Sequence, residues 1–93
     1  MKKLNPLLHQ ELRLSIISFL ANVEWVEFNK LLEATSASKG NLSVQLKKLE
    51  TADYIEIEKS FKDNYPLTRC RMTELGRDEL ESYIQTLKSM LDI

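Results

Sequence analysis

The sequence predicts a mainly α-helical fold with one small β-hairpin, which places it in the α+β class. In four separate stretches, apolar residues recur at steps of three and four, the pattern of amphipathic helices. Between residues 54 and 72, two stretches instead alternate apolar and polar residues, the pattern of strands. With 93 residues the chain is expected to form one domain, residues 1–93, in the order helix, helix, helix, strand, strand, helix.

The first two helices are expected in the N-terminal third of the chain. Pro6 suits the first position of a helix and Asn5 its N-cap, so the first helix is expected to run from there to about Asn22. The stretch VEWVEF either forms a brief strand or packs Trp25 against the core. A second, short helix is expected over residues 27–34.

The third helix is expected over residues 38–52, with Ser38 as its N-cap. Leu42, Leu46 and Leu49 form one apolar stripe along it, so that side faces the core. The opposite face carries small, polar and basic side chains instead of a uniform layer of charge. This unusual face is the first candidate binding surface.

A hairpin and a last helix complete the chain. Ile55 and Ile57 alternate with acidic residues in the first strand, and the hairpin is expected over residues 54–72. The stretch FKDNYP has turn chemistry, and a loop of several residues is expected there. Thr73 then caps a helix over residues 74–92.

Composition and motifs exclude several classes of function. No apolar run approaches the roughly 18–20 residues of a membrane span, and Glu11 and Arg13 interrupt the apolar N-terminal stretch, so a cytoplasmic protein is expected. His9 and Cys70 are each the only residue of their type, so neither a disulfide within the chain nor a metal site is expected. There is no glycine-rich phosphate loop and no nucleophile motif. We therefore expect neither an enzyme nor a cofactor.

The distribution of charge is more informative than its sum. The net charge is −1, yet residues 39–71 carry seven basic against five acidic residues, whereas residues 72–93 carry two against five. Positive charge is therefore concentrated in the third helix and the hairpin.

These elements together predict a winged helix-turn-helix that binds DNA. A short helix, a turn and a helix with a polar outer face form a helix-turn-helix, and the basic hairpin that follows adds the wing. A helix with a slim polar face fits the major groove, where Asn41 can hydrogen-bond adenine and Val44 can contact a thymine methyl. The alternative is that the lysines only keep the helix soluble. The residues expected to face the groove are Lys39, Gly40, Asn41, Ser43, Val44, Lys47 and Lys48.

The hairpin adds a second set of DNA-binding candidates. A wing lies along the DNA backbone or enters the minor groove, whose negative potential attracts basic side chains. For Arg69 and Arg71 an alternative is open, namely ion pairs across the hairpin to Glu56 or Glu58. The wing residues expected to contact DNA are Lys59, Lys62, Asn64, Arg69 and Arg71.

Nearly the whole chain resembles the winged-helix DNA-binding domain family of small prokaryotic transcriptional regulators, relatives of MarR and ArsR. The resemblance is carried by HQELRLSIISFL, by VEFNKLLEATSASKGNLSVQLKKLETADYIEIEKSF and by TRCRMTELGRDELESYIQTLKSM, most specifically by GNLSVQLKKLE and LTRCRMTELGRDEL. It implies a cytoplasmic homodimer that binds a palindromic operator in double-stranded DNA. The Cys-x-Cys signature of metal-sensing ArsR relatives is absent, and Val44 and Gln45 stand where such families often have a basic residue or histidine.

The resemblance also implies that the first and last helices form the dimer interface. The last helix supports this by itself, because its large apolar residues exceed what one neighbouring helix can cover. The alternative is that all of them belong to the internal core. The residues expected in the interface are Leu8, Leu12, Tyr83, Ile84, Leu87, Met90 and Leu91. The rival function is a winged-helix module for protein–protein interaction, which the net charge and the acidic last helix would suit.

Overall fold

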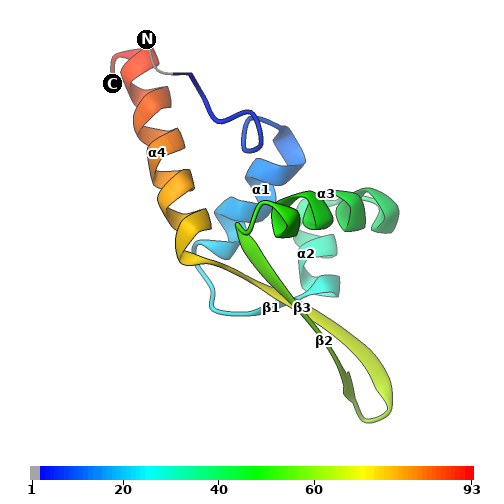
Figure 1. Ribbon diagram of the computed structural model, residues 1–93. Coiled ribbons are helices and arrows are strands. Elements are labelled where there is room, and N and C mark those ends of the chain that lie inside the picture. Colours follow the sequence, from blue (N-terminus) through cyan, green and yellow to red (C-terminus); the bar gives the residue numbers. More distant parts are fainter. Residues whose placement is uncertain (1–2) are drawn as a thin grey trace.

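The computed structural model describes residues 3–93 and confirms the expected α+β fold and element order (Figure 1). One short strand adds to that order, so VEWVEF does contain a strand. The elements are α1 (Glu11–Leu20), β1 (Val26–Glu27), α2 (Phe28–Thr35), α3 (Lys39–Thr51), β2 (Ile55–Lys62), β3 (Tyr65–Met72) and α4 (Glu74–Leu91).

The first helix begins later than expected. Asn5 caps only a single turn, in which its Oδ1 accepts a hydrogen bond from the backbone N–H of Leu7 (2.9 Å). Gln10 then adopts an extended conformation (φ −150°, ψ 131°) that interrupts the helical path. Its side chain accepts from the N–H of Arg13 (2.7 Å), so Gln10 and not Asn5 is the N-cap of α1. The turn directs Leu8 into the core, where it is fully buried.

Side-chain caps position α3 and α4 as the sequence predicts. Ser38 Oγ accepts from the N–H of Asn41 (3.1 Å), and Thr73 Oγ1 accepts from the N–H of Gly76 (3.0 Å). Gly76 is required for packing, because a Cβ there would collide with the carbonyl oxygen of Tyr54. The start of α4 is therefore held directly against the start of the wing.

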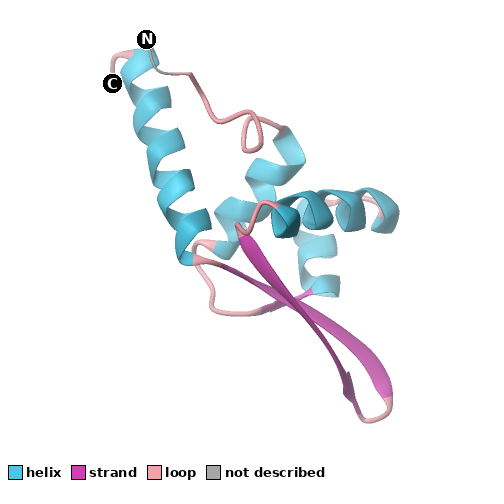
Figure 2. Ribbon diagram, viewed as in Figure 1, coloured by secondary structure: helices cyan, strands magenta, loops and turns pink. Residues whose placement is uncertain are grey.

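The sheet is antiparallel with the strand order β1–β3–β2 (Figure 2). Its hairpin turn is tighter than expected, because Lys62 pairs with Tyr65 and leaves a loop of only two residues. Those residues, Asp63 and Asn64, have φ values of 51° and 68°. Asp and Asn tolerate this left-handed region, and two such residues form the type I′ turn that matches the twist of a hairpin. The expected loop of several residues is therefore wrong.

The core lies where α1, α2, α3 and the inner half of the hairpin meet. The expected stripe of α3 is buried, with Leu42, Leu46 and Leu49 at most 3% exposed. The same cluster takes Ile16 and Ile17 from α1. Burial of this stripe fixes which side of α3 faces outward.

Two elements project from this core. The molecule measures 51 × 25 × 21 Å, with the end of the wing and the C-terminal half of α4 at opposite extremes (Figure 1). Within residues 3–93, no helix combines the length and the apolar character needed to cross a membrane.

Candidate nucleic-acid interface

The outward face of α3 is exposed throughout. Val44 is 52% exposed although it is apolar, and a Cβ on Gly40 would meet nothing within 4 Å. This side of the helix is therefore slim and open to a large partner. All seven residues expected to face the groove are exposed, namely Lys39, Gly40, Asn41, Ser43, Val44, Lys47 and Lys48.

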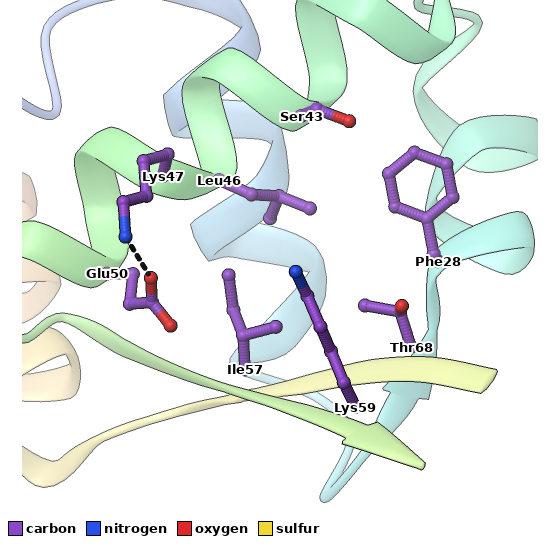
Figure 3. Close-up of a pocket in the computed structure, with 8 residues that line it drawn as sticks. All are labelled: Phe28, Ser43, Leu46, Lys47, Glu50, Ile57, Lys59 and Thr68. Carbon is purple, nitrogen blue, oxygen red and sulfur yellow. Dashed lines mark hydrogen bonds and ion pairs between the residues drawn. The ribbon is translucent and has the colours of Figure 1, made fainter. Parts of the chain in front are cut away.

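A groove of about 670 Å³ separates this face from the wing (Figure 3). Leu46, Ile57 and Phe28 give it an apolar floor, and the side chain of Lys59 rises from β2 toward α3. Lys47 lies on the helix side, where its Nζ contacts Glu50 Oε1 (3.1 Å). The helix and the wing thus bound one continuous concave surface.

Lys59 contributes positive charge to this groove. It is exposed, and no ion pair or hydrogen bond of its side chain occurs in the described part of the chain. Lys62 and Asn64 are likewise exposed at the end of the hairpin. Three of the five expected wing residues therefore project from the distal half of the wing.

Arg69 and Arg71 form the cross-hairpin ion pairs that were the alternative interpretation. Arg69 Nε lies 2.7 Å from Glu58 Oε1, and Arg71 Nη2 lies 2.9 Å from Glu56 Oε2. Both guanidinium groups also stack on Trp25, at 4.3 and 4.7 Å from its ring. The hydrogen bond from Arg69 lowers the pKa of Glu58. These two arginines thus connect β2, β3 and Trp25 at the base of the wing, and their charges are already compensated.

A polar network that the sequence patterns did not predict connects α3 to α1. Gln45 is 8% exposed, and its Oε1 accepts from Arg13 Nη1 (2.6 Å). Arg13 also donates through Nε to the carbonyl oxygen of Leu7 (2.6 Å). The sequence does indicate that Gln45 is buried, because it lies three residues after Leu42 and four before Leu49, on the same side of the helix.

This network orients the side chain of Asn41. Arginine has only donors, so Arg13 must meet the carbonyl oxygen of Gln45, and the amide nitrogen of Gln45 then points away from Arg13. That nitrogen donates to Asn41 Oδ1 (3.1 Å). Because the Oδ1 of Asn41 accepts this hydrogen bond, its amide nitrogen, a donor, is left for a partner at the exposed face.

The expected dimer residues divide into three groups. Leu8 is fully buried, and Tyr83 is 5% exposed with its hydroxyl 3.0 Å from His9 Nδ1, so these two side chains belong to the core of the chain itself. Leu12 and Leu87 are half-buried against the core. The remaining three of the seven, Ile84, Met90 and Leu91, are exposed and offer the most surface to a partner.

Cys70 is buried at the centre of the sheet. Desolvation raises the pKa of its thiol to about 12, so the thiol stays protonated at neutral pH and is a poor nucleophile. Among the described residues, no group of three or more His, Cys, Asp or Glu side chains could hold a metal ion.

Comparisons with known proteins agree with this geometry. Residues 12–91 match the family model described as a winged helix DNA-binding domain. An uncharacterized protein of Methanocaldococcus jannaschii is 36% identical over 72 residues, covering 77% of this chain and 78% of the relative.

Solved structures show the same fold. A transcriptional regulator homologue from Pyrococcus horikoshii superposes with a TM-score of 0.86 at 26% identity, covering 92% of this chain and 85% of that one. A protein of Porphyromonas gingivalis assigned to the MarR family of transcriptional regulators has a TM-score of 0.70 at 21% identity, with 91% and 82% covered. The resemblance inferred from the sequence is confirmed, and the chain belongs to the family of winged-helix DNA-binding domains.

Proposed function

We propose that this protein is a transcriptional regulator that binds a palindromic operator as a homodimer. The observation that carries the proposal is the concave surface shared by α3 and the wing, with a slim helix face on one side and Lys59 on the other. Membership of a DNA-binding family supports it.

The exposed face of α3 suits the major groove, which is about 12 Å wide and admits a helix. Gly40 and Ser43 allow close approach, and Val44 can contact a thymine methyl. Because Asn41 presents its amide nitrogen, it favours bases with acceptors there. Guanine has two such acceptors, so we propose guanine in place of the adenine expected from the residue type alone.

The groove between α3 and the wing suits one sugar–phosphate strand. When α3 lies in the major groove and the wing reaches the adjacent minor groove, the strand that separates the two grooves passes between them. Lys59 would then meet a phosphate, and the apolar floor would face the sugars. Ser43 lines the helix side of the groove and can donate to the same strand.

Dimerisation would rest on the exposed end of α4. Leu80, Leu87 and Leu91 continue one stripe along the helix, which is buried at Leu80 but 59% exposed at Leu91. Met90 (50%) and Ile84 (39%) flank the exposed part. A two-fold contact there would cover this apolar surface and place two recognition helices about 34 Å apart, one turn of DNA.

The test is selection of genomic fragments by the purified protein at roughly 50–100 mM salt, where phosphate contacts hold. An enriched palindrome supports the proposal. Retention without an enriched sequence would contradict a specific operator and indicate non-specific DNA binding. No retention by a folded protein would favour the protein–protein interaction module.

Sedimentation tests the dimer separately. Leu91→Glu should shift the protein from dimer to monomer, because the charge would be buried in the contact. Ser89→Glu is the matched control, since Ser89 is equally near the end of α4 but lies on the opposite side of the helix. A dimer that survives Leu91→Glu would show that α4 is not the contact.

A further inference from the structure

The end of the wing carries an apolar pair that the proposed function does not use. Phe61 is 77% exposed, and it lies directly across the hairpin from Pro66, which is also exposed. A single exposed aromatic side chain needs no explanation. Here, however, the strand register pairs two apolar residues next to the hairpin turn. That end of the hairpin projects from the rest of the molecule (Figure 1).

The strand register places this pair on the groove side of the hairpin. Side chains two residues apart lie on the same face, so Phe61 shares a face with Lys59 and with the half-buried Ile57. The other face carries the Arg–Glu pairs and, at the end, Tyr65. Phe61 and Pro66 therefore continue the surface proposed to hold the DNA strand.

The surrounding charge favours a nucleic acid as the occupant. Lys59 precedes Phe61 on the same face of β2, Lys62 follows it on the opposite face, and neither has an acidic partner in residues 3–93. Asp63 is the acidic residue of the turn, and with a φ of 51° it serves the backbone conformation of that turn. Lysines beside an apolar side chain suit the minor groove, where the potential is negative and the base edges and sugars are partly apolar.

We propose that Phe61, supported by Pro66, is a wedge that enters the minor groove and bends the operator. Phe and Pro are among the side chains that proteins insert between base steps, with kinks of about 20–90°. The two-residue turn stiffens the support for the wedge, because it leaves no mobile loop beside Phe61. This inference rests on the proposed function and specifies what its wing does.

The experiment measures the bend of a selected operator duplex labelled with donor and acceptor dyes at its two ends. Binding of the natural protein should shorten the end-to-end distance. Phe61→Ala should abolish that change while the salt dependence of binding is unaltered, since no charge is lost. Phe61→Leu should retain part of the bend, because leucine also serves as a wedge.

Tyr65→Ala is the matched control, since Tyr65 is 75% exposed at the same end of the wing but on the opposite face. It should leave the bend unchanged. An unchanged bend in Phe61→Ala, or an equal loss in Tyr65→Ala, would overturn the wedge. Binding without any bend by the natural protein would overturn the wedge alone, whereas no binding at all would overturn the proposed function with it.

Discussion

Helix α3, which we propose as the recognition helix, and the wing hold their exposed side chains in different ways. On α3 one residue of the exposed face, Asn41, is held by hydrogen bonds that run from Arg13 through Gln45. In the wing the order is confined to the base, where the two arginines pair with glutamates and stack on Trp25. At the end of the wing, no ion pair or arginine–aromatic stacking occurs among the described residues. The side chains of Lys59 and Lys62 are therefore unpaired there.

This difference shows that basic residues of one interface are not equivalent. An arginine that is already paired with a glutamate contributes little net charge to a phosphate, and here it links the two strands at the base of the wing. An unpaired lysine has few internal contacts, and its charge remains available to DNA. We therefore expect different roles for Arg71 and Lys59, although the sequence predicted that both contact the DNA backbone.

The largest expected effect, on both stability and base discrimination, comes from removing the hydrogen bond between Arg13 and Gln45. Arg13→Met deprives the buried oxygen of Gln45 of its donor, so we expect a loss of about 1–3 kcal/mol in the free energy of unfolding. Gln45 can then rotate, Asn41 is no longer held, and discrimination at one base position should relax. Denaturant unfolding and binding to single-base operator variants measure the two effects.

The double variant Arg13→Met/Gln45→Leu is the control. Replacing both partners by apolar groups removes the unsatisfied oxygen, so stability should recover beyond that of the single variant. Base discrimination should stay relaxed, because Asn41 still lacks its partner. If the single variant were fully stable and as selective as the natural protein, the network would not position Asn41.

Much of the fold followed from local patterns, and the exceptions have a common cause. The stripe of Leu42, Leu46 and Leu49 and the caps at Ser38 and Thr73 depend on residues close in sequence, and both were predictable. The first helix was placed too early, because Pro6 and Asn5 form a plausible start whether or not Gln10 interrupts it. The interrupted path is the one in which Leu8 is buried in the core, a contact with residues far along the chain.

The candidate site was predictable in its exposed residues but not in its contacts. The face of α3 follows from the helical period once the buried stripe is known. The partner of Gln45, however, lies 32 residues away in α1. The pairing of Arg69 with Glu58 was left open against DNA contact, because it depends on the register set by the two-residue turn. The Arg13–Gln45 contact thus has no local signal, whereas the Arg69–Glu58 pair follows once the turn is known to have two residues.

The base and the end of the wing should differ in how much they contribute to the salt dependence of DNA binding. Lys59→Ala should lower the slope of log affinity against log salt by about one unit, as expected for one lost phosphate contact. Arg71→Met/Glu56→Gln removes an internal ion pair without changing the net charge, and it should leave the slope unchanged. Equal slopes for the Lys59 variant and the natural protein would show that the distal wing does not contact phosphates.

The smallest expected effect is on folding stability at acidic pH, and it arises from the Arg69–Glu58 pair at the base of the wing. Because Arg69 lowers the pKa of Glu58 in the folded state, the ionised pair adds stability above the ordinary carboxyl pKa of about 4.5. This contribution is lost as the pH falls from that value through the lowered pKa of the folded protein, since the unfolded chain then binds the proton more tightly. The effect should be small and should weaken further with salt, because both side chains are partly exposed (37% and 44%).

In a carbon-13 NMR titration the Glu58 carboxyl should titrate below its ordinary range, and Arg69→Met should raise its pKa again. An unchanged Glu58 titration in that variant would mean that the arginine stiffens the hairpin through Trp25 and not through its ion pair.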